Sequence, residues 1–326
     1  MFLLVLVIAV ALAFDFTNGF HDTANYVATW VGTRAISPRP AIAISAAANL
    51  AGAFVTTAVA STVANSLISG ATNETLLAAL LGAIVWNLLT WWIGLPSSST
   101  HALVGGLVGA ALVQSGTSGV QWSGIWQKVI LPGLTSPVIG FIAAFAIVVI
   151  IYRLLHRVTP GAANRGFRGG QLLTGTWLAF THGANDAQKT MGVIALALAL
   201  HSGQAEAQSI PTWVKISCGL TIAAGTYVGG WRIIRTLGQR IYGMQPEHGF
   251  ASQLAAGSTL WLGTKYGFPI STTHVVSGSV MGAGSTRRLS AVKWGVAGNI
   301  VFAWILTLPA AALVAAALYY PISWIF

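Results

Sequence analysis

Apolar blocks bounded by glycine, proline or charged residues recur along the whole chain. A transmembrane α-helix needs about 20 mostly apolar residues to cross a bilayer core of about 30 Å. We expect ten such segments, near residues 3–31, 40–62, 75–95, 97–114, 134–156, 171–200, 212–231, 250–267, 270–285 and 292–318. The pattern therefore predicts an all-α polytopic membrane protein. The first block has no basic residue before Asp15, so we expect it to open the first transmembrane helix rather than to form a cleaved signal peptide.

The composition supports a membrane protein. Of the 326 residues, 55% are hydrophobic and only 7% are charged. A soluble domain carries about 25% charged residues, which excludes a soluble enzyme and, for lack of charge, a disordered chain. The 13 tryptophans suit interfacial anchors. The single cysteine, Cys218, rules out a disulfide within the chain.

The formal net charge of +10 raises the question of nucleic-acid binding. Twelve of the basic residues, however, follow alternate segments. They are Arg34 and Arg39; Arg153, Arg157, Arg165 and Arg168; Arg232, Arg235 and Arg240; and Arg287, Arg288 and Lys293. If the N-terminus is outside and every segment crosses once, all four groups lie on the cytoplasmic side. We therefore expect a multi-pass protein of the plasma (inner) membrane with both termini outside, whose partner is the lipid bilayer and not nucleic acid.

The chain contains an internal repeat. Residues 16–22 align with 180–186 at four of seven positions, and residues 96–109 align with 269–282 at six of fourteen. The repeat predicts an N-terminal unit at 1–156, a basic cytoplasmic linker at 157–170 and a C-terminal unit at 171–326. Five crossings in each half make the second half inverted relative to the first, a plan common in secondary transporters and also found in channels.

Polar residues inside the predicted membrane segments mark the candidate site. Asp15, Asp22 and Asp186 lie within apolar surroundings, where a charged side chain is expensive. Asp22 and Asn25 in the first half, and Asn185, Asp186, Gln188 and Lys189 in the second, combine cation ligands with hydrogen-bond donors. The alternative for Asp186 is a structural ion pair with Lys189. Gly19 and Gly183 precede these groups and are expected to permit helix breaks that line a cavity.

In each half, a proline is followed by hydroxyl residues and then by an apolar run, which predicts a helix N-terminus. These residues are Ser98, Ser99 and Thr100, and Ser271, Thr272 and Thr273. Two such N-termini, one from each half, can converge on an anion; the alternatives are ordinary capping and helix packing. His101 and His274 follow at matching positions, as proton-sensitive groups or as structural hydrogen-bonding residues. No metal-ligand spacing is present, and neither a metal nor a cofactor is expected.

These residues resemble the PiT family of inorganic phosphate transporters. Residues 182–192 are similar to the family's C-terminal signature almost residue for residue, residues 19–25 are a looser first copy, and the Pro-to-His stretches resemble its paired hairpin motifs. The resemblance implies broken or hairpin helices at the substrate site and phosphate uptake with Na⁺ or H⁺ by alternating access. It implies phosphate donors at the six hydroxyl residues, and phosphate or cation sites at Asp22, Asn25, Asp186 and Gln188.

The residue at the place of Asn25 in the second half is Lys189, whose ammonium can stand in for a bound Na⁺. This slightly favours H⁺ as the coupling ion. Alternatives are transport of another oxyanion such as sulfate, an anion channel, and an intramembrane hydrolase, although no Gly-x-Ser-x-Gly elbow is present. The sequence leaves open a homodimer and the transport of phosphate as a divalent-metal complex.

Overall fold

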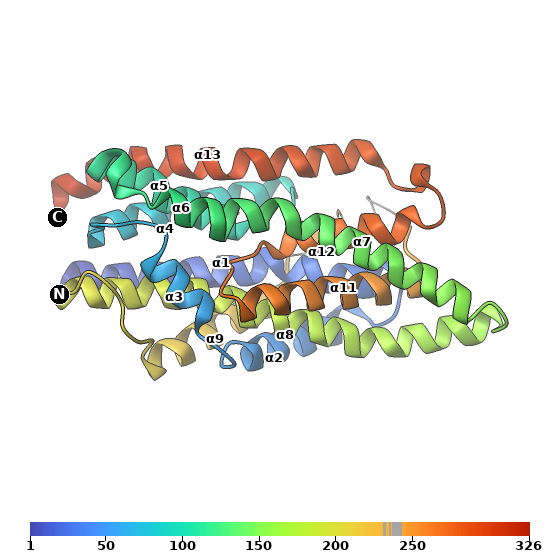
Figure 1. Ribbon diagram of the computed structural model, residues 1–326. Helices are drawn as coiled ribbons and strands as arrows, with labels where there is room; N and C mark the ends of the chain where they lie inside the picture. Colours follow the sequence, from blue (N-terminus) through green and yellow to red (C-terminus); the bar gives the residue numbers. More distant parts are fainter. Residues whose placement is uncertain (231–232, 235, 237–242) are drawn as a thin grey trace.

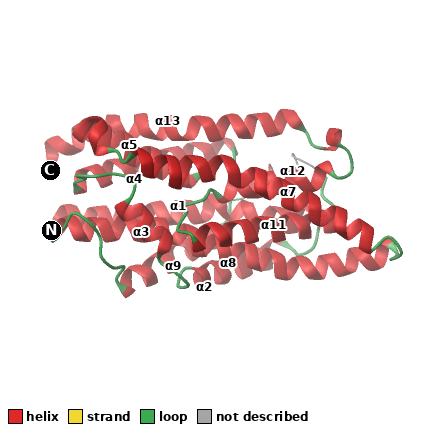
Figure 2. Ribbon diagram, viewed as in Figure 1, coloured by secondary structure: helices red, strands yellow, loops and turns green. Residues whose placement is uncertain are grey.

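The structure is a computed structural model that describes residues 1–230, 233–234, 236 and 243–326 (Figure 1). Over these residues it is a bundle of helices with one isolated β-bridge and no strand (Figure 2). The helices are α1 (Phe2–Gly32), α2 (Pro38–Gly52), α3 (Ala58–Asn65), α4 (Asn73–Ile93), α5 (Ser99–Ser115), α6 (Trp122–Gly124), α7 (Leu131–Leu154), α8 (Pro160–His201), α9 (Thr212–Val228), α11 (Pro246–Lys265), α12 (Thr272–Ser285) and α13 (Trp294–Ile325). The expected all-α class is confirmed.

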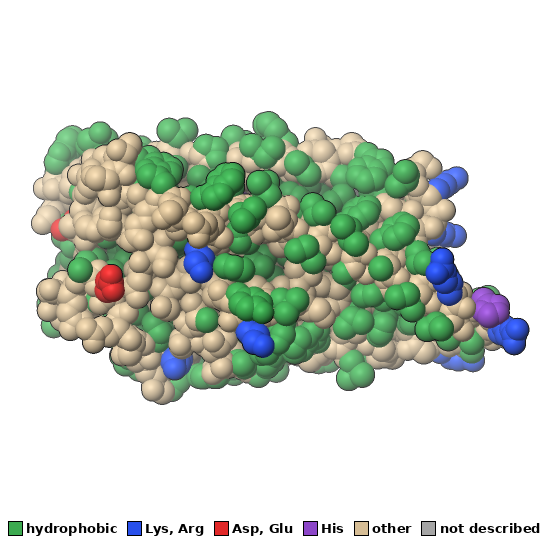
Figure 3. Space-filling model, viewed as in Figure 1, with side chains coloured by type: hydrophobic (Ala, Val, Ile, Leu, Met, Phe, Trp, Pro, Cys, Tyr) green, Lys and Arg blue, Asp and Glu red, His purple; other side chains and the backbone are tan. Residues whose placement is uncertain are grey.

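Within the part of the chain that the structure describes, five stretches are long and apolar enough to cross a membrane, among them α1, α4 and α13 and the segment that contains α7. The outer surface is correspondingly apolar, as the hydrophobic side chains scattered over the face in Figure 3 show. A protein with such a surface is a multi-pass membrane protein because water cannot solvate these side chains.

Both termini lie at one end of the bundle, and α7 turns into α8 at the opposite end (Figure 1). Lys and Arg side chains gather at that opposite end in Figure 3. This fits the expected grouping of basic residues, although Arg232, Arg235 and Arg240 lie outside the described residues. The expected linker at 157–170 is helical from Pro160 onward, where it forms the first turns of the 42-residue α8.

Two hairpins replace four of the expected separate crossings. α4 packs against α5, and α11 packs against α12; each pair turns inside the bundle, α4 and α5 in the half that holds the termini (Figure 1). α12 has 14 residues, so it is about 21 Å long and cannot cross a core of about 30 Å. The count of ten crossings is therefore not confirmed, whereas hairpin helices are present as expected.

The turns of the two hairpins use glycine in the same way. α4 is followed by Gly94 with φ of 70°, and α11 is followed within two residues by Gly267 with φ of 71°. Only glycine adopts this left-handed conformation without a steric penalty. These glycines are 173 positions apart, which is the offset of the hairpin repeat, so the repeat extends from sequence to backbone conformation.

Helix breaks occur at other places than expected. The segment expected at 40–62 is split between α2 and α3, whereas α1 and α8 run unbroken through Gly19 and Gly183. A Cβ at Gly19 would collide with the carbonyl oxygen of Ile222, and one at Gly183 would collide with the backbone of Asn49. These glycines therefore let α9 approach α1 and let α2 approach α8, as small residues do between membrane helices.

Candidate functional site

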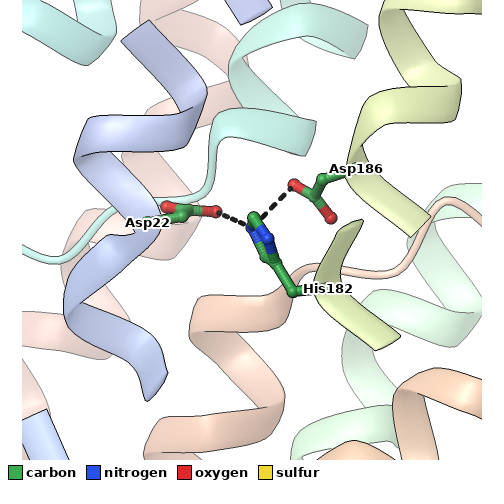
Figure 4. Close-up of side chains that lie close together, drawn as sticks. All are labelled: Asp22, His182 and Asp186. Atoms are coloured by element: carbon green, nitrogen blue, oxygen red, sulfur yellow. Dashed lines mark ion pairs between the residues drawn. The ribbon is translucent and has the colours of Figure 1, made fainter. Parts of the chain in front are cut away.

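The middle of the bundle holds two carboxylates with an imidazole between them (Figure 4). α1 supplies Asp22, and α8 supplies His182 and Asp186. His182 Nε2 lies 3.7 Å from Asp22 Oδ2 and 3.6 Å from Asp186 Oδ2. All three side chains are buried, and one ligand atom from each lies within 4.8 Å of the others. We call these three residues the central cluster.

Asn49 sets the orientation of the His182 ring. Its amide nitrogen donates to Tyr26 Oη at 2.9 Å and to Thr226 Oγ1 at 3.0 Å. The amide oxygen is therefore left to accept from His182 Nδ1 at 2.8 Å. His182 Nε2 has no hydrogen-bond partner. It faces the carboxylates either as a proton donor or, when neutral, as a ligand for a cation.

The tip of each hairpin contacts the aspartate of its own half. Ser99 Oγ, at the start of α5, donates to Asp22 Oδ2 at 3.1 Å. Thr272 Oγ1, at the start of α12, donates to Asp186 Oδ1 at 3.4 Å. The repeat thus brings the N-termini of α5 and α12, with their free backbone N–H groups, to the central cluster.

The first hydroxyl of each tip has a capping role. Ser98 Oγ accepts from the backbone N–H of His101 at 3.1 Å, and Ser271 Oγ accepts from that of His274 at 3.3 Å. This is the capping arrangement that the sequence left as an alternative. Each serine keeps its own O–H proton for a further acceptor.

The third hydroxyl of each tip contacts the opposite half of the chain. Asn25 Nδ2 donates to Thr273 Oγ1 at 3.0 Å, and Lys189 Nζ donates to Thr100 Oγ1. The two contacts occupy equivalent positions in the repeat. Neither half therefore forms the site alone.

Lys189 differs from its counterpart Asn25 in charge. Its ammonium contacts three oxygens: Asp186 Oδ1 at 2.8 Å, the carbonyl oxygen of Ile270 at 3.3 Å, and the hydroxyl of Thr100. A carboxylate, a carbonyl and a hydroxyl are also the oxygen types that hard metal cations take in proteins. The ion pair that the sequence left as an alternative for Asp186 is present, inside the site.

Gln188 does not face the central cluster. Its Oε1 accepts from the backbone N–H groups of Val59 at 2.8 Å and Ala60 at 3.2 Å. These two N–H groups belong to the first turn of α3 and have no acceptor within that helix, because the chain breaks after α2. The side chain therefore holds the break in place.

Asn185 and Asp15 also point elsewhere. Asn185 Nδ2 donates to Thr264 Oγ1 at 2.9 Å and to the carbonyl oxygen of Phe268 at 3.0 Å, which fixes the turn between α11 and α12. Asp15 Oδ1 accepts from Thr190 Oγ1 at 2.9 Å. Asp15, which the sequence grouped with the other intramembrane charges, therefore contacts Thr190 and neither hairpin tip.

Several polar residues of the site were not singled out from the sequence. His21 Nδ1 lies 2.9 Å from Asp22 Oδ1, and its Nε2 lies 3.2 Å from Thr90 Oγ1 and 3.4 Å from Ser97 Oγ. Asn18 Nδ2 donates to Asp186 Oδ2 at 3.2 Å. His182 lies within the second copy of the repeat, residues 180–186, and this position is the sequence feature that could have marked it as a site residue.

His101 and His274 meet where the two hairpins approach each other. Their ring centroids are 4.6 Å apart at an interplanar angle of 81°, and His274 stacks on Trp304 at 4.1 Å. Both line a largely apolar cavity of about 340 Å³ beside Gly133 of α7. They therefore lie behind the hairpin tips and not at the central cluster.

The arrangement suits an oxyanion accompanied by a cation. Hydroxyls and helix N-termini donate hydrogen bonds to anionic oxygens. Two carboxylates and one ammonium leave a net negative charge before His182 is counted, so an anion enters favourably only with a positive charge. Asp22 and Asp186 can also accept from a protonated oxygen of the anion.

Known phosphate transporters resemble this chain. The phosphate transporter family model matches residues 18–315. A relative from Mycobacterium bovis, described as a "Probable low-affinity inorganic phosphate transporter", is 47% identical over 98% of this chain and 77% of its own length. A relative of the same description from Bacillus subtilis is 40% identical over 99% of this chain and 98% of its own length.

The fold is also found in a solved structure, titled the sodium-dependent phosphate transporter. It superimposes with a TM-score of 0.91 at 27% identity, over 100% of both chains. The relatives are named as transporters and the matching fold is that of a transporter, so this protein is not an enzyme. The chain belongs to the phosphate transporter family.

Proposed function

We propose that this protein imports inorganic phosphate by symport with a cation, H⁺ rather than Na⁺, through alternating access. The observation that carries the proposal is the pair of hairpin tips. Ser99 and Thr272 bring two helix N-termini, one from each half, to the central cluster. Inverted repeats of secondary transporters form substrate sites in this way, with broken helices near the bilayer midplane.

Phosphate fits the donor and acceptor set better than sulfate. HPO₄²⁻ has three oxygens that accept and one hydroxyl that donates, whereas sulfate has no proton near neutral pH. A site made only of donors would suit sulfate. Asp22 and Asp186 supply acceptors for the phosphate hydroxyl, and for sulfate they would add only repulsion.

The position of Lys189 favours protons over sodium. Its ammonium is buried among three oxygens and already supplies a fixed positive charge beside Asp186. A metal ion at that place would meet like-charge repulsion. The sodium-dependent transporter of matching fold makes the sodium alternative concrete, so the coupling ion is the part of the proposal that most needs a direct test.

The distribution of basic residues supports the orientation proposed here. The end of the bundle where α7 turns into α8 carries Arg153, Arg157, Arg165 and Arg168. By the positive-inside rule this end faces the cytoplasm. Both termini then lie on the outer side of the plasma membrane (Figure 1).

Purified protein in proteoliposomes tests the function. Labelled phosphate uptake is measured with an inward proton gradient alone, with an inward sodium gradient alone, and with excess external sulfate. We expect accumulation with the proton gradient and little competition by sulfate. Accumulation driven by sodium alone would contradict proton coupling, and equal competition by sulfate would contradict phosphate selectivity.

The matched variants are Asp186→Asn and Glu206→Gln. Each removes one carboxylate, but Glu206 is exposed in the loop before α9. We expect Asp186→Asn to abolish accumulation and Glu206→Gln to leave it unchanged. Downhill phosphate flux that never exceeds equilibrium would identify a channel instead.

A further inference from the structure

One buried acid, Asp15, takes no part in the phosphate site. Its side chain has no solvent exposure. Oδ1 accepts from the Thr190 hydroxyl at 2.9 Å, and Oδ2 has no hydrogen-bond partner. Within the described residues, no Lys, Arg or His side chain lies at ion-pair distance from it, in contrast to Asp22 and Asp186.

The helices packed most extensively against α1 are α9, α4 and α8. α8 carries Asp186 and Lys189, which act on Asp15 with opposite signs, and α9 carries the buried thiol of Cys218. The only titratable residue of α4 is Glu74, in its first turn. Beyond these groups, α1, α8 and α9 contribute apolar side chains to one hydrophobic cluster.

An ionised carboxylate in such surroundings, contacted among the described residues only by one neutral hydroxyl and the backbone of Ile222, is poorly compensated. A metal cation would need several oxygen ligands, and among the described side chains only the hydroxyl of Thr190 contacts the two oxygens of Asp15. A proton needs only the one free oxygen. We infer that Asp15 Oδ2 binds the proton that is transported together with phosphate, at a site separate from the phosphate site.

This inference rests on the proposed phosphate symport and deepens it. Asp15 precedes Asp22 by seven residues on the continuous helix α1, so it lies about 10 Å nearer the end of the bundle that holds the termini. A proton that enters from the outer side reaches Asp15 before it reaches the central cluster. Thr190, its partner, directly follows Lys189, so one turn of α8 contacts both sites.

Electrostatics then links the two sites. A unit negative charge about 10 Å away, at an effective dielectric constant of about 20, favours protonation by on the order of tenfold. Bound phosphate therefore increases proton affinity at Asp15. Because such coupling is reciprocal, a bound proton increases phosphate affinity by the same factor. This mutual effect is what symport requires.

Asp15→Asn tests the inference because asparagine keeps the hydrogen bond from Thr190 and resembles a permanently protonated acid. Proteoliposomes that contain pyranine report proton entry while labelled phosphate is counted. We expect proton entry with phosphate, and accumulation driven by the proton gradient, to fall at least tenfold. Exchange of external for internal phosphate, which needs no proton release, continues. Asp15→Glu restores coupling, and Glu206→Gln serves as the control.

Each outcome has a definite meaning. Coupled proton entry by Asp15→Asn at the wild-type ratio would overturn the inference while leaving the proposed function intact. Wild-type protein that accumulates phosphate without proton entry would instead refute the proton coupling on which the inference rests.

A second variant tests the same site even where Asp15→Asn does not fold. Thr190→Val removes the donor that stabilises the carboxylate form of Asp15, so the acid stays protonated to higher pH. We expect the pH midpoint of phosphate uptake to rise by about one unit, which corresponds to the free energy of one hydrogen bond to a charged group. An unchanged midpoint in this variant would overturn the inference.

Discussion

Lys189→Asn gives the second half of the repeat the same residue that the first half has at the equivalent position, Asn25. The substitution removes the ammonium but keeps a polar side chain at this position. Asp186 then lacks its ion-pair partner. The three oxygens that surrounded the ammonium become free for another cation, and we expect the variant to require sodium for uptake.

The magnitude follows from the geometry of the ion pair. Lys189 Nζ and Asp186 Oδ1 are 2.8 Å apart and both side chains are buried. At an effective dielectric constant of about 20, their attraction is about 6 kcal/mol. Loss of one partner from a buried pair costs about 3–5 kcal/mol. The smaller figure corresponds to on the order of a hundredfold loss of uptake, and sodium at about 100 times its Kd returns about 2.7 kcal/mol.

Uptake of labelled phosphate by proteoliposomes in sodium-free and sodium-containing buffers measures this effect. We expect the variant to lose about two orders of magnitude without sodium and to regain most of that loss with it. Lys265→Asn is the matched control, because Lys265 is exposed at the end of α11. Equal uptake by Lys189→Asn in both buffers would refute the idea that the ammonium occupies a cation site.

Three further predictions follow from the packing. His182→Ala leaves both carboxylates of the central cluster without the imidazole, and we expect phosphate binding measured by calorimetry to weaken at least tenfold; unchanged affinity would exclude a role at the site. Gly19→Ala places a methyl group against the backbone of α9. We expect this to lower the free energy of unfolding by about 1–3 kcal/mol and therefore to lower the apparent melting temperature. Gly166→Ala, at an open position of α8, is its control and should not lower that temperature. Gln188→Leu removes the cap of α3 and should lower stability by about 1–2 kcal/mol, while a loss of transport at unchanged stability would place Gln188 in the substrate site instead.

Much of the fold could be predicted from the sequence, because membrane helices must be apolar over a fixed length. The same rule explains the errors. Blocks such as 75–95 and 97–114 are apolar enough to cross, and only their packing against each other in the structure, with the left-handed turn at Gly94, shows that they form a hairpin. The break between α2 and α3 has no proline, and it is stabilised by Gln188 from a distant helix, which no local pattern indicates.

The site was predictable where the repeat duplicates it. Asp22 and Asp186, with the hydroxyls of both hairpins, were found because each has a partner at the matching position. Asn49 has no such signal, and its role becomes visible only when the structure shows its amide holding His182. Asp15 was noticed as a charge, but its separation from the central cluster depends on packing against α8.

The pseudo-symmetric site is held together unequally. The hairpin of α4 and α5 is bound to the opposite half by the Lys189 ammonium at Thr100, whereas the hairpin of α11 and α12 is bound to it by the neutral amide of Asn25 at Thr273. A charge-assisted hydrogen bond is roughly twice as strong as a neutral one. These two polar contacts therefore differ in the free energy needed to break them. Under the proposed alternating access, this difference biases which of the two polar contacts opens first, and Lys189→Asn should reduce the bias.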